Sequence, residues 1–489
     1  MPINLMILSK IAKNLGQEVK IIDYDFKLKI HELEDNWVSV LEKDFKDFLP
    51  NIIGITTNCG NYPIVIEISK ILKKLNEECL IFLGGPQAGA VPIQTLREYK
   101  SVDFIIEGEG ERTFEMLIKH KFKNFEDIKG VYYRKNNTII YTGERCVMED
   151  LDKSPIPDYD SINIYKYIEN IKKIEIPVVS IEVGRGCPFN CTFCSTSIYW
   201  KRHYRTKSVN RVIEEIQYFY DKGVRNFNFI HDNLTVNKKY CEGLCRQIKY
   251  NFSDIKWNCS SRVDNLDIDF INILKMGGCS GIFLGIETGS QSMQKKINKN
   301  LNIYKVLSCI KDCIENGISI TTSFIIGFPD ESVDDMNETL QLALNCKLAG
   351  ADIEIQILSP MCGTELFNKY YDLIAYPDKI LEKRCYKFDS LSIKNDIKEN
   401  KDIFGFYHFF INKNFDYKFL WICLTIFKIG ITNNAEKIKS ILNTRKIKFT
   451  DLANIIYKNI DLNSLHINEE KISYFDVSYK LLKEIDKLV

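Results

Sequence analysis

Short apolar segments alternate with helical segments along two long stretches of the chain, and this alternation limits the folds that the chain can adopt. In the first 120 residues, apolar strand signals at 51–56, 80–83 and 103–106 are each followed by a helical segment. Buried strands that alternate with helices are typical of a parallel sheet with helices on both faces. The first part of the chain therefore predicts a doubly wound α/β domain.

A second alternating series starts at Val179, after a proline-rich stretch at 153–158 that breaks both patterns. Five helical segments separate its six predicted strands, which fits a partial parallel (β/α)6 barrel. The six strands are predicted at 179–183, 226–230, 255–260, 281–286, 319–326 and 352–357. Active sites of such barrels lie at the carboxyl ends of the strands, so we expect the functional residues there.

The breaks between these series suggest a domain plan. Near the N-terminus, residues 5–15 predict a helix that ends at Gly16, and residues 19–23 predict a strand. A hairpin is predicted at 130–143, and beyond about residue 396 the pattern turns helical. We therefore predict an α/β domain at 1–150, a linker at 151–175, the barrel at 176–365 and a mostly helical region at 366–489.

The net charge argues against a nucleic-acid partner, and the length of the apolar runs argues against a membrane span. The 66 Lys and Arg residues are matched by 65 Asp and Glu residues, which leaves a formal net charge of +1. Binding to a phosphate backbone usually needs a basic excess. The apolar run at 419–427 is far shorter than the roughly 20 residues of a membrane span. We expect no nucleic-acid partner and no membrane span.

The chain contains 16 cysteines, and their context favours reduced thiols. The N-terminus lacks the basic segment and the long apolar run of a secretory signal. A chain of 489 residues is also far larger than the small scaffolds that depend on disulfides. We therefore expect a cytoplasmic protein.

Three cysteines at C-x3-C-x2-C spacing give the strongest chemical signal. Cys187, Cys191 and Cys194 follow directly after the first predicted barrel strand, and a loop of this spacing can bring three sulfurs together. Thiolates select zinc or iron–sulfur clusters. A structural zinc site normally has four protein ligands, whereas a cluster held by three cysteines keeps one iron open. The spacing therefore favours such a cluster over a zinc knuckle.

The motif from Cys187 through Cys191 to Cys194 resembles that of the radical S-adenosylmethionine (SAM) superfamily. The resemblance implies a 4Fe-4S cluster whose open iron binds the amino and carboxylate groups of SAM. One electron, supplied by a donor of the flavodoxin or ferredoxin type, would then cleave SAM to methionine and a 5'-deoxyadenosyl radical. That radical would abstract hydrogen from a substrate, while the protein positions the cofactor and excludes solvent.

Further matches to this superfamily lie at the ends of successive predicted strands. The resemblance assigns Asp232 to the SAM amino group, Arg262 to its carboxylate and Glu287 to its ribose hydroxyls. Ser260 ends the third strand, and Ile326 lies in a segment that resembles the adenine-contacting turn of the family. Taken singly, charged residues of this kind are more often surface ion-pair partners. Their joint placement at strand ends favours a SAM site.

The first domain and the barrel together resemble the cobalamin-binding branch of radical SAM enzymes, over about residues 3–365. This resemblance implies a Rossmann-like cobalamin domain, and doubly wound sheets bind ligands at the carboxyl ends of their strands. The residues that carry it are Ile55-Thr56-Thr57, Gly84-Gly85-Pro86-Gln87 and Glu107-Gly108-Glu109-Gly110-Glu111. We therefore predict cobalamin contacts at Gly84, Gly85, Gly108, Glu109 and Gly110.

The first domain departs from the cobalamin-binding pattern in two ways. No histidine occurs between His31 and His120, so the Asp-x-His-x-x-Gly motif of the axial ligand is absent, as is usual in this branch. The chain also opens with Pro2-Ile3-Asn4-Leu5, which resembles the start of the first helix of the branch. The first strand, expected upstream, is missing from this pattern. We expect a shortened domain or a start further upstream, and cobalamin held without a protein histidine on its cobalt.

These resemblances predict an enzyme that methylates carbon through methylcobalamin or forms C–C bonds by radical chemistry, on a natural-product or peptide substrate. One alternative is a methylthiotransferase, which would usually carry three more cluster cysteines and a C-terminal RNA-binding barrel. Only Cys59, Cys79 and Cys146 precede the motif, on scattered elements. The other alternative is a non-enzymatic iron–sulfur sensor, which would need the cluster but not the predicted SAM contacts.

Overall fold

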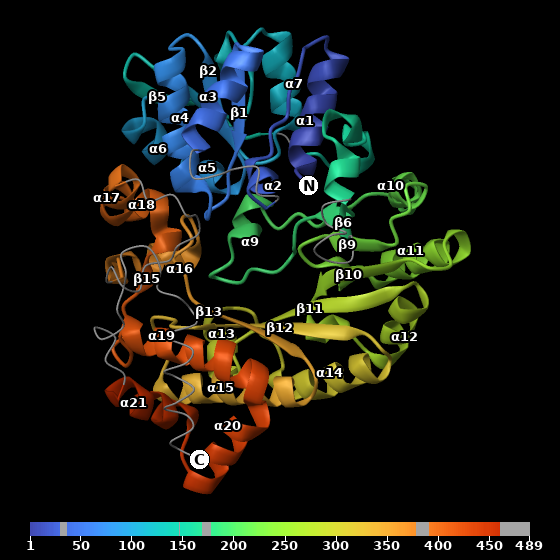
Figure 1. The fold of residues 1–489 in the computed structure, drawn as a ribbon, viewed down its shortest axis with the longest axis vertical. Helices are drawn as coiled ribbons and strands as arrows, with labels where there is room; N and C mark the ends of the chain where they lie inside the picture. Colours follow the sequence, from blue (N-terminus) through green and yellow to red (C-terminus); the bar gives the residue numbers. More distant parts are fainter. Residues whose placement is uncertain (30–36, 146, 169–177, 378–390, 460–489) are drawn as a thin grey trace.

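Two sheets dominate the computed structural model, one in the N-terminal part and one across the middle of the molecule (Figure 1). The C-terminal helices lie beside and below the second sheet. The structure describes residues 1–29, 37–145, 147–168, 178–377 and 391–459.

The N-terminal sheet has the strand order β1-β2-β3-β4-β5, in which three parallel strands are followed by an antiparallel hairpin. Asn136 and Asn137 form the hairpin turn, and both have a positive φ, which asparagine tolerates. The strands are β1 (Ile52–Thr56), β2 (Leu80–Gly84), β3 (Phe104–Ile106), β4 (Val131–Lys135) and β5 (Thr138–Tyr141). The helices are α1 (Ile3–Asn14), α2 (Tyr24–Lys29), α3 (Trp37–Phe48), α4 (Tyr62–Leu75), α5 (Pro86–Ala90), α6 (Pro92–Glu98) and α7 (Glu111–Lys119).

The strand predicted at 19–23 is wrong, because the chain there is not part of either sheet. Asp23 directly precedes α2 and accepts the backbone N–H of Phe26 at 2.9 Å. An aspartate side chain offers the first turn of a helix a hydrogen bond that a strand does not use.

The second sheet has six parallel strands in the order β13-β12-β11-β10-β9-β6. Their spatial order follows the chain order, and β6 does not pair with β13, so the barrel is open and the predicted partial barrel is confirmed. The strands are β6 (Val178–Glu182), β9 (Asn226–Ile230), β10 (Lys256–Ser261), β11 (Cys279–Glu287), β12 (Ser319–Ile326) and β13 (Asp352–Ile357). The helices between them are α10 (Val209–Tyr220), α11 (Lys238–Asn251), α12 (Ile268–Met276), α13 (Gln291–Lys296), α14 (Val306–Glu315) and α15 (Val333–Leu348).

The C-terminal region is helical, as predicted, and touches both sheet domains. Its elements are α16 (Glu365–Lys369), β14 (Ile374–Ala375), α17 (Leu391–Glu399), α18 (Lys401–Phe404), β15 (Phe409–Phe410), α19 (Tyr417–Thr425), a π-helix (Ile426–Ile431), α20 (Thr432–Arg445) and α21 (Phe449–Asn459). Helix α17 contacts α4 of the first domain, and α19 contacts β13 of the barrel. Among the described residues, no helix has the length and apolar character needed to cross a membrane.

Candidate cofactor site

The predicted cluster loop lies where the two domains meet. It begins after β7 (Gly184–Arg185), which follows the first barrel strand, and ends at α9 (Ser195–Tyr199). Helix α9 contacts α5, the helix that directly follows β2 of the N-terminal sheet (Figure 1). The loop therefore lies at the carboxyl end of β6 and beside the carboxyl end of β2.

The three predicted ligands, Cys187, Cys191 and Cys194, are free thiols and are half-buried. Burial raises the pKa of Cys187, and it raises the pKa of Cys191 to about 11, with further contributions from the neighbouring thiols. Across the described residues, no three His, Cys, Asp or Glu side chains surround one metal-ion position. Thiolates are the ligands of iron–sulfur clusters, so the chemistry of these three residues fits the predicted cluster.

Asp232 follows β9 and reaches the start of the cluster loop. Its Oδ2 accepts the backbone N–H of Gly186 at 2.8 Å. Burial raises the pKa of Asp232, although the N–H of Gly186 acts in the opposite direction. Gly186 has a φ of 88°, and a Cβ at this position would lie 1.9 Å from the carbonyl oxygen of His203, so only glycine fits here. Asp232 thus fixes the backbone next to Cys187.

Arg262 lies against the cluster loop from the end of β10. Its guanidinium is 3.9 Å from the ring centre of Phe189, which lies between the first two cysteines. Two of its nitrogens donate to the carboxylate of Asp264, at 2.9 and 2.6 Å, and Nη2 also donates to the carbonyl of Lys299 at 2.9 Å. Arg262 is therefore held in place by its neighbours, with one face on the loop.

Glu287 ends β11 and is paired with a buried lysine. The Nζ of Lys299 donates to Oε1 of Glu287 at 2.8 Å, and both side chains are nearly excluded from solvent. After burial, Lys299 is the strongest influence on the pKa of Cys191, and it lowers that pKa. A buried cation thus lies between the predicted ribose-binding carboxylate and a predicted cluster ligand.

Ser260 lies near the end of β10 and Ile326 ends β12, and β11 separates these two strands in the sheet. Ser260 is half-buried, and its hydroxyl has no hydrogen-bond partner in the described part of the chain. Ile326 is fully buried, and its carbonyl accepts the N–H of Leu358 at 2.8 Å. Ser260 therefore has a free polar atom for a ligand, whereas the carbonyl of Ile326 already accepts one hydrogen bond.

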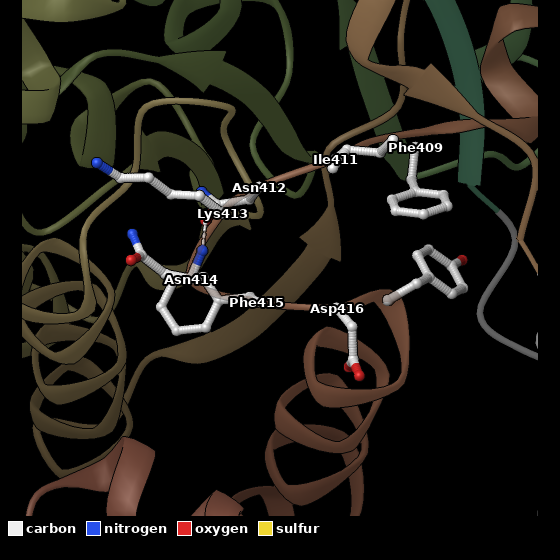
Figure 2. Close-up of a pocket in the computed structure, with 8 residues that line it drawn as sticks. Phe409, Ile411, Asn412, Lys413, Asn414, Phe415 and Asp416 are labelled. Carbon is white, nitrogen blue, oxygen red and sulfur yellow. Dashed lines mark hydrogen bonds between the residues drawn. The ribbon is translucent and has the colours of Figure 1, made fainter.

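The turn after Ile326 is held from the C-terminal region. Nδ2 of Asn412 donates to the carbonyls of Phe328 at 2.7 Å and Glu331 at 3.0 Å. Asn412 also lies beside a cavity of about 330 Å³, shown in Figure 2. The cavity is lined by Phe409, Ile411, Asn412, Lys413, Asn414, Phe415, Asp416 and Tyr417, none of which belongs to the cluster loop.

At the carboxyl end of β2, Gly84 and Gly85 differ in their surroundings. A Cβ added to Gly84 would meet no atom within 4 Å, so the backbone there is open to a ligand. Gly85 has a φ of 98°, and a Cβ there would lie 2.5 Å from the carbonyl oxygen of Thr57. Gly85 is therefore required by the fold itself, whereas Gly84 leaves space.

The second predicted cobalamin turn, Gly108 to Gly110, is occupied by protein groups. A Cβ on Gly108 would lie 2.0 Å from the guanidinium carbon of Arg145. The carboxylate of Glu109 accepts hydrogen bonds from Arg185 and Arg205 of the barrel domain. Gly110 precedes α7 as its N-terminal flanking residue. This turn faces the barrel rather than open space.

Family models match both parts of the chain. The model of the radical SAM superfamily matches residues 181–343, and that of the B12 binding domain matches residues 1–118. An uncharacterised methyltransferase of Pyrococcus horikoshii is 32% identical over 370 residues, which cover 75% of this chain and 78% of the relative. The chain belongs to the cobalamin-binding radical SAM family. It is thus an enzyme of a cobalamin-dependent methyltransferase family whose cofactors are a 4Fe-4S cluster, SAM and cobalamin.

Two further comparisons show the breadth of this radical SAM family. The anaerobic magnesium-protoporphyrin IX monomethyl ester cyclase of Cereibacter sphaeroides is 28% identical over 348 residues, which cover 69% of this chain and 56% of the cyclase. The solved structure of OxsB, a cobalamin-dependent SAM radical enzyme with aqua-cobalamin and SAM bound, has a TM-score of 0.67. It is 16% identical and covers all of this chain and 73% of OxsB, so it supports the fold.

Several residues at the site of this radical SAM enzyme escaped the sequence analysis. Lys299 lies in the Lys- and Asn-rich tract 295–302, which reads as an exposed charged loop. Arg185 and Arg205 flank the cysteine motif, but nothing in their spacing indicates that they pair with Glu109. One feature of the sequence could have indicated Arg185. It lies two residues before Cys187, a position from which its side chain can hold the cluster loop.

Proposed function

We propose that this protein methylates a carbon atom of a polar small molecule or peptide. The observation that carries the proposal is the contact between α5 and α9, which brings the carboxyl end of β2 beside the cluster loop. Cobalamin can carry a methyl group and the cluster with SAM can supply a radical, and both must reach one substrate carbon. Adjoining sites meet that requirement without a large movement of either domain.

In this proposal the three cysteines, the two glycines at the end of β2 and the strand-end residues of the barrel have the roles that the sequence predicts. Cys187, Cys191 and Cys194 hold the cluster, and Gly84 and Gly85 border cobalamin. The SAM site is bordered by Asp232, Ser260, Arg262, Glu287 and Ile326, with Lys299 as an added cation. The proposed domains are residues 1–150, 151–175, 176–365 and 366–489. The electron comes from a protein of the flavodoxin or ferredoxin type.

The inner face of the open barrel supports a substrate with hydrogen-bond donors. Side chains alternate along β13, where Ile355 and Ile357 are buried against the helices, so Glu354 and Gln356 lie on the opposite face and are exposed. Glu354 pairs with Ser323, whose hydroxyl is 3.5 Å from the carboxylate of Glu287 on the same face. A carboxylate and an amide beside the proposed SAM site favour a substrate with amine or hydroxyl groups over an anionic one.

The products of SAM test this proposal. Anaerobically reconstituted protein with cobalamin and a reductant should release 5'-deoxyadenosine slowly without substrate. Addition of the true substrate should yield S-adenosylhomocysteine as well, because each methyl group comes from one SAM. The Cys187→Ala, Cys191→Ala and Cys194→Ala triple variant should release no 5'-deoxyadenosine above background. If the triple variant is as active as the wild type, the assignment of the cluster is wrong.

A second candidate, radical C–C bond formation, is favoured by the similarity to the cyclase of Cereibacter sphaeroides. Such a reaction would consume SAM to form 5'-deoxyadenosine without S-adenosylhomocysteine. The ratio of the two products, measured by liquid chromatography with mass spectrometry, therefore separates the two candidates.

A further inference from the structure

Three carboxylates and three guanidinium groups form a buried cluster of charges between the two domains. We call it the interdomain ion cluster, and its positive and negative charges balance. Its members are Glu109, Glu111, Arg145, Glu182, Arg185 and Arg205, all at most 8% exposed. Buried charges are costly unless they are paired, and each member of this cluster has a partner of opposite charge within 3.5 Å. Separation of the two domains would leave these charges without their partners.

Arg185 connects the interdomain ion cluster to the start of the cluster loop, which carries the three cysteines. Its Nε and Nη2 donate to the carboxylate of Glu182 in the barrel at 2.9 and 3.0 Å. On the other side, Nη2 donates to Glu111 at 2.6 Å and Nη1 to Glu109 at 3.1 Å, both in the N-terminal domain. Since Arg185 precedes Cys187 by two residues, carboxylates from both domains fix the entry to the loop.

The carboxylate of Glu109 has no capacity left for another ligand. Its Oε1 accepts from Arg185 and from Arg205, the latter at 2.9 Å. Its Oε2 accepts from Arg205 at 3.0 Å and from the backbone N–H of Met148 at 3.1 Å. A carboxylate offers about four acceptor positions, and here all four are used.

The exit of the loop is fixed to the same turn of the N-terminal domain. The hydroxyl of Tyr199 donates to the carbonyl of Gly108 at 2.9 Å, and Nη2 of Arg145 donates to the carbonyl of Tyr199 at 2.5 Å. The ring of Trp200 lies 5.8 Å from the guanidinium of Arg185 and 5.9 Å from that of Arg205. The turn from Gly108 to Glu111 therefore touches both ends of the cluster loop.

We infer that Glu109 is a positioning residue that sets the place of the cluster loop, rather than a contact of cobalamin. The inference rests on the proposed role of Cys187, Cys191 and Cys194 as cluster ligands. Movement of the loop would break charge-assisted hydrogen bonds in a place that water does not reach. Glu109 thereby fixes the cluster loop relative to the N-terminal domain, and with it the place where SAM binds.

Full-length protein with the substitution Glu109→Gln tests the inference, because glutamine keeps the shape and removes the charge. The protein is purified anaerobically with hydroxocobalamin and reconstituted with iron and sulfide. Iron content, retained cobalamin and the electron paramagnetic resonance spectrum of the reduced cluster are then measured during titration with SAM. We expect iron and cobalamin to stay at the wild-type level, while the SAM concentration at half-change of the spectrum rises about ten- to a hundredfold. Glu109→Asp, which keeps the charge, should recover part of this loss.

Glu215→Gln is the matched control. Glu215 is another buried carboxylate, paired with Lys207 at 2.7 Å and Arg211 at 3.1 Å, and neither partner belongs to the loop that carries the cysteines. Its substitution should leave the SAM titration of the spectrum unchanged. Loss of cobalamin with an unchanged spectrum in Glu109→Gln would overturn the inference, as would an equal shift in both variants. A wild-type protein that takes up no cluster would instead overturn the proposed function.

Discussion

Glu287 combines an unusual backbone with a buried charge. Its φ is 70°, a conformation that costs free energy for any residue except glycine, and the pairing of β11 with β12 shifts register between Gly285 and Glu287. Irregularities of this kind re-aim a side chain and are frequent next to active sites. Here the carboxylate is aimed at Lys299, which also lowers the pKa of Cys191. Lys299 therefore links the proposed SAM site to the cluster.

Replacement of Lys299 should affect both stability and SAM binding. Lys299→Met leaves the carboxylate of Glu287 buried without its cation, which we expect to lower the free energy of unfolding by about 3 kcal/mol. SAM affinity should fall about tenfold, as for the loss of one charged hydrogen bond. Urea denaturation and equilibrium dialysis with SAM measure the two effects. Lys295→Met, at an exposed position, should change neither, and equal effects in both variants would contradict the prediction.

The buried carboxyl of Glu331 should make the free energy of unfolding depend on pH. Burial raises the pKa of Glu331 to about 8, although its Oε2 accepts the N–H of Gly327 at 2.7 Å, and its Oε1 has no partner in the described structure. In the unfolded chain this carboxyl ionises near its usual pKa of 4.5. The folded state therefore loses stability as the pH rises from 4.5 to about 8, by about 2 kcal/mol between pH 6 and pH 8.

Urea midpoints at pH 6 and pH 8 check this dependence. Glu331→Gln is neutral at both values and should remove the part of the slope that comes from this residue. An identical slope in the wild type and the variant would show that Glu331 is ionised in the folded protein.

At the scale of elements, the C-terminal region holds the barrel turn that follows β12. Asn412, next to β15, donates to carbonyls on that turn, and Asn414 donates to the carbonyl of Glu331 at 3.0 Å. A Cβ on Gly327 would lie 2.8 Å from the side chain of Leu420 in α19, so the helix is packed directly on the turn. The position of the proposed adenine-contacting turn thus depends on residues outside the barrel.

Removal of the Asn412 amide should loosen this turn. Asn412→Ala leaves the buried carbonyls of Phe328 and Glu331 with fewer donors, and we expect a loss of about 2 kcal/mol in the free energy of unfolding. The protease sensitivity of the folded protein and its SAM affinity report on the turn itself. Asn414→Ala, which removes one donor at the edge of the cavity in Figure 2, should have at most half the effect. Equal losses would contradict the prediction, because they would show that Asn412 holds the turn no more than Asn414 does.

At the scale of the molecule, the two sheets present their carboxyl ends to one region. The end of β2 is joined to the cluster loop through α5 and α9, and the C-terminal region bridges the two domains from the side (Figure 1). Nε2 of Gln87, beside the open backbone of Gly84, donates to the carbonyl of Ile403 at 2.7 Å. The proposed cobalamin and SAM sites are therefore parts of one assembly with separate binding residues.

Because the proposed cobalamin and SAM sites use separate residues, we expect cobalamin to bind independently of the cluster and SAM. Gly84→Val adds a side chain where a Cβ meets no protein atom, so the fold should persist while cobalamin binding weakens at least about tenfold. Gel filtration after incubation with hydroxocobalamin, followed by an absorbance spectrum, measures retention. Iron content after reconstitution should match the wild type, and unchanged cobalamin retention would place the cofactor elsewhere.

The local pattern of the sequence was enough to predict both sheets and the cysteine loop. Alternation of apolar strands with helices depends on residues close together in the chain, and it predicted the six strands of the open barrel. Cys187, Cys191 and Cys194 lie within eight residues, so their spacing alone is enough to predict a cluster site. Local pattern failed at 19–23, where the chain forms neither a strand nor a helix and Asp23 accepts a hydrogen bond from the first turn of α2.

Only the tertiary structure decided what the charged residues do. Glu109 meets Arg185 and Arg205, which lie 76 and 96 positions away in the chain, and Lys299 is buried although its neighbours in sequence are polar. Periodicity and spacing report on neighbours along the chain, whereas the pairing of buried charges is set by which surfaces meet when the two domains pack. The sequence by itself therefore determined the fold class and the cluster motif, and the packing of the domains decided which carboxylates remain open to a ligand and which are used to hold the cluster loop.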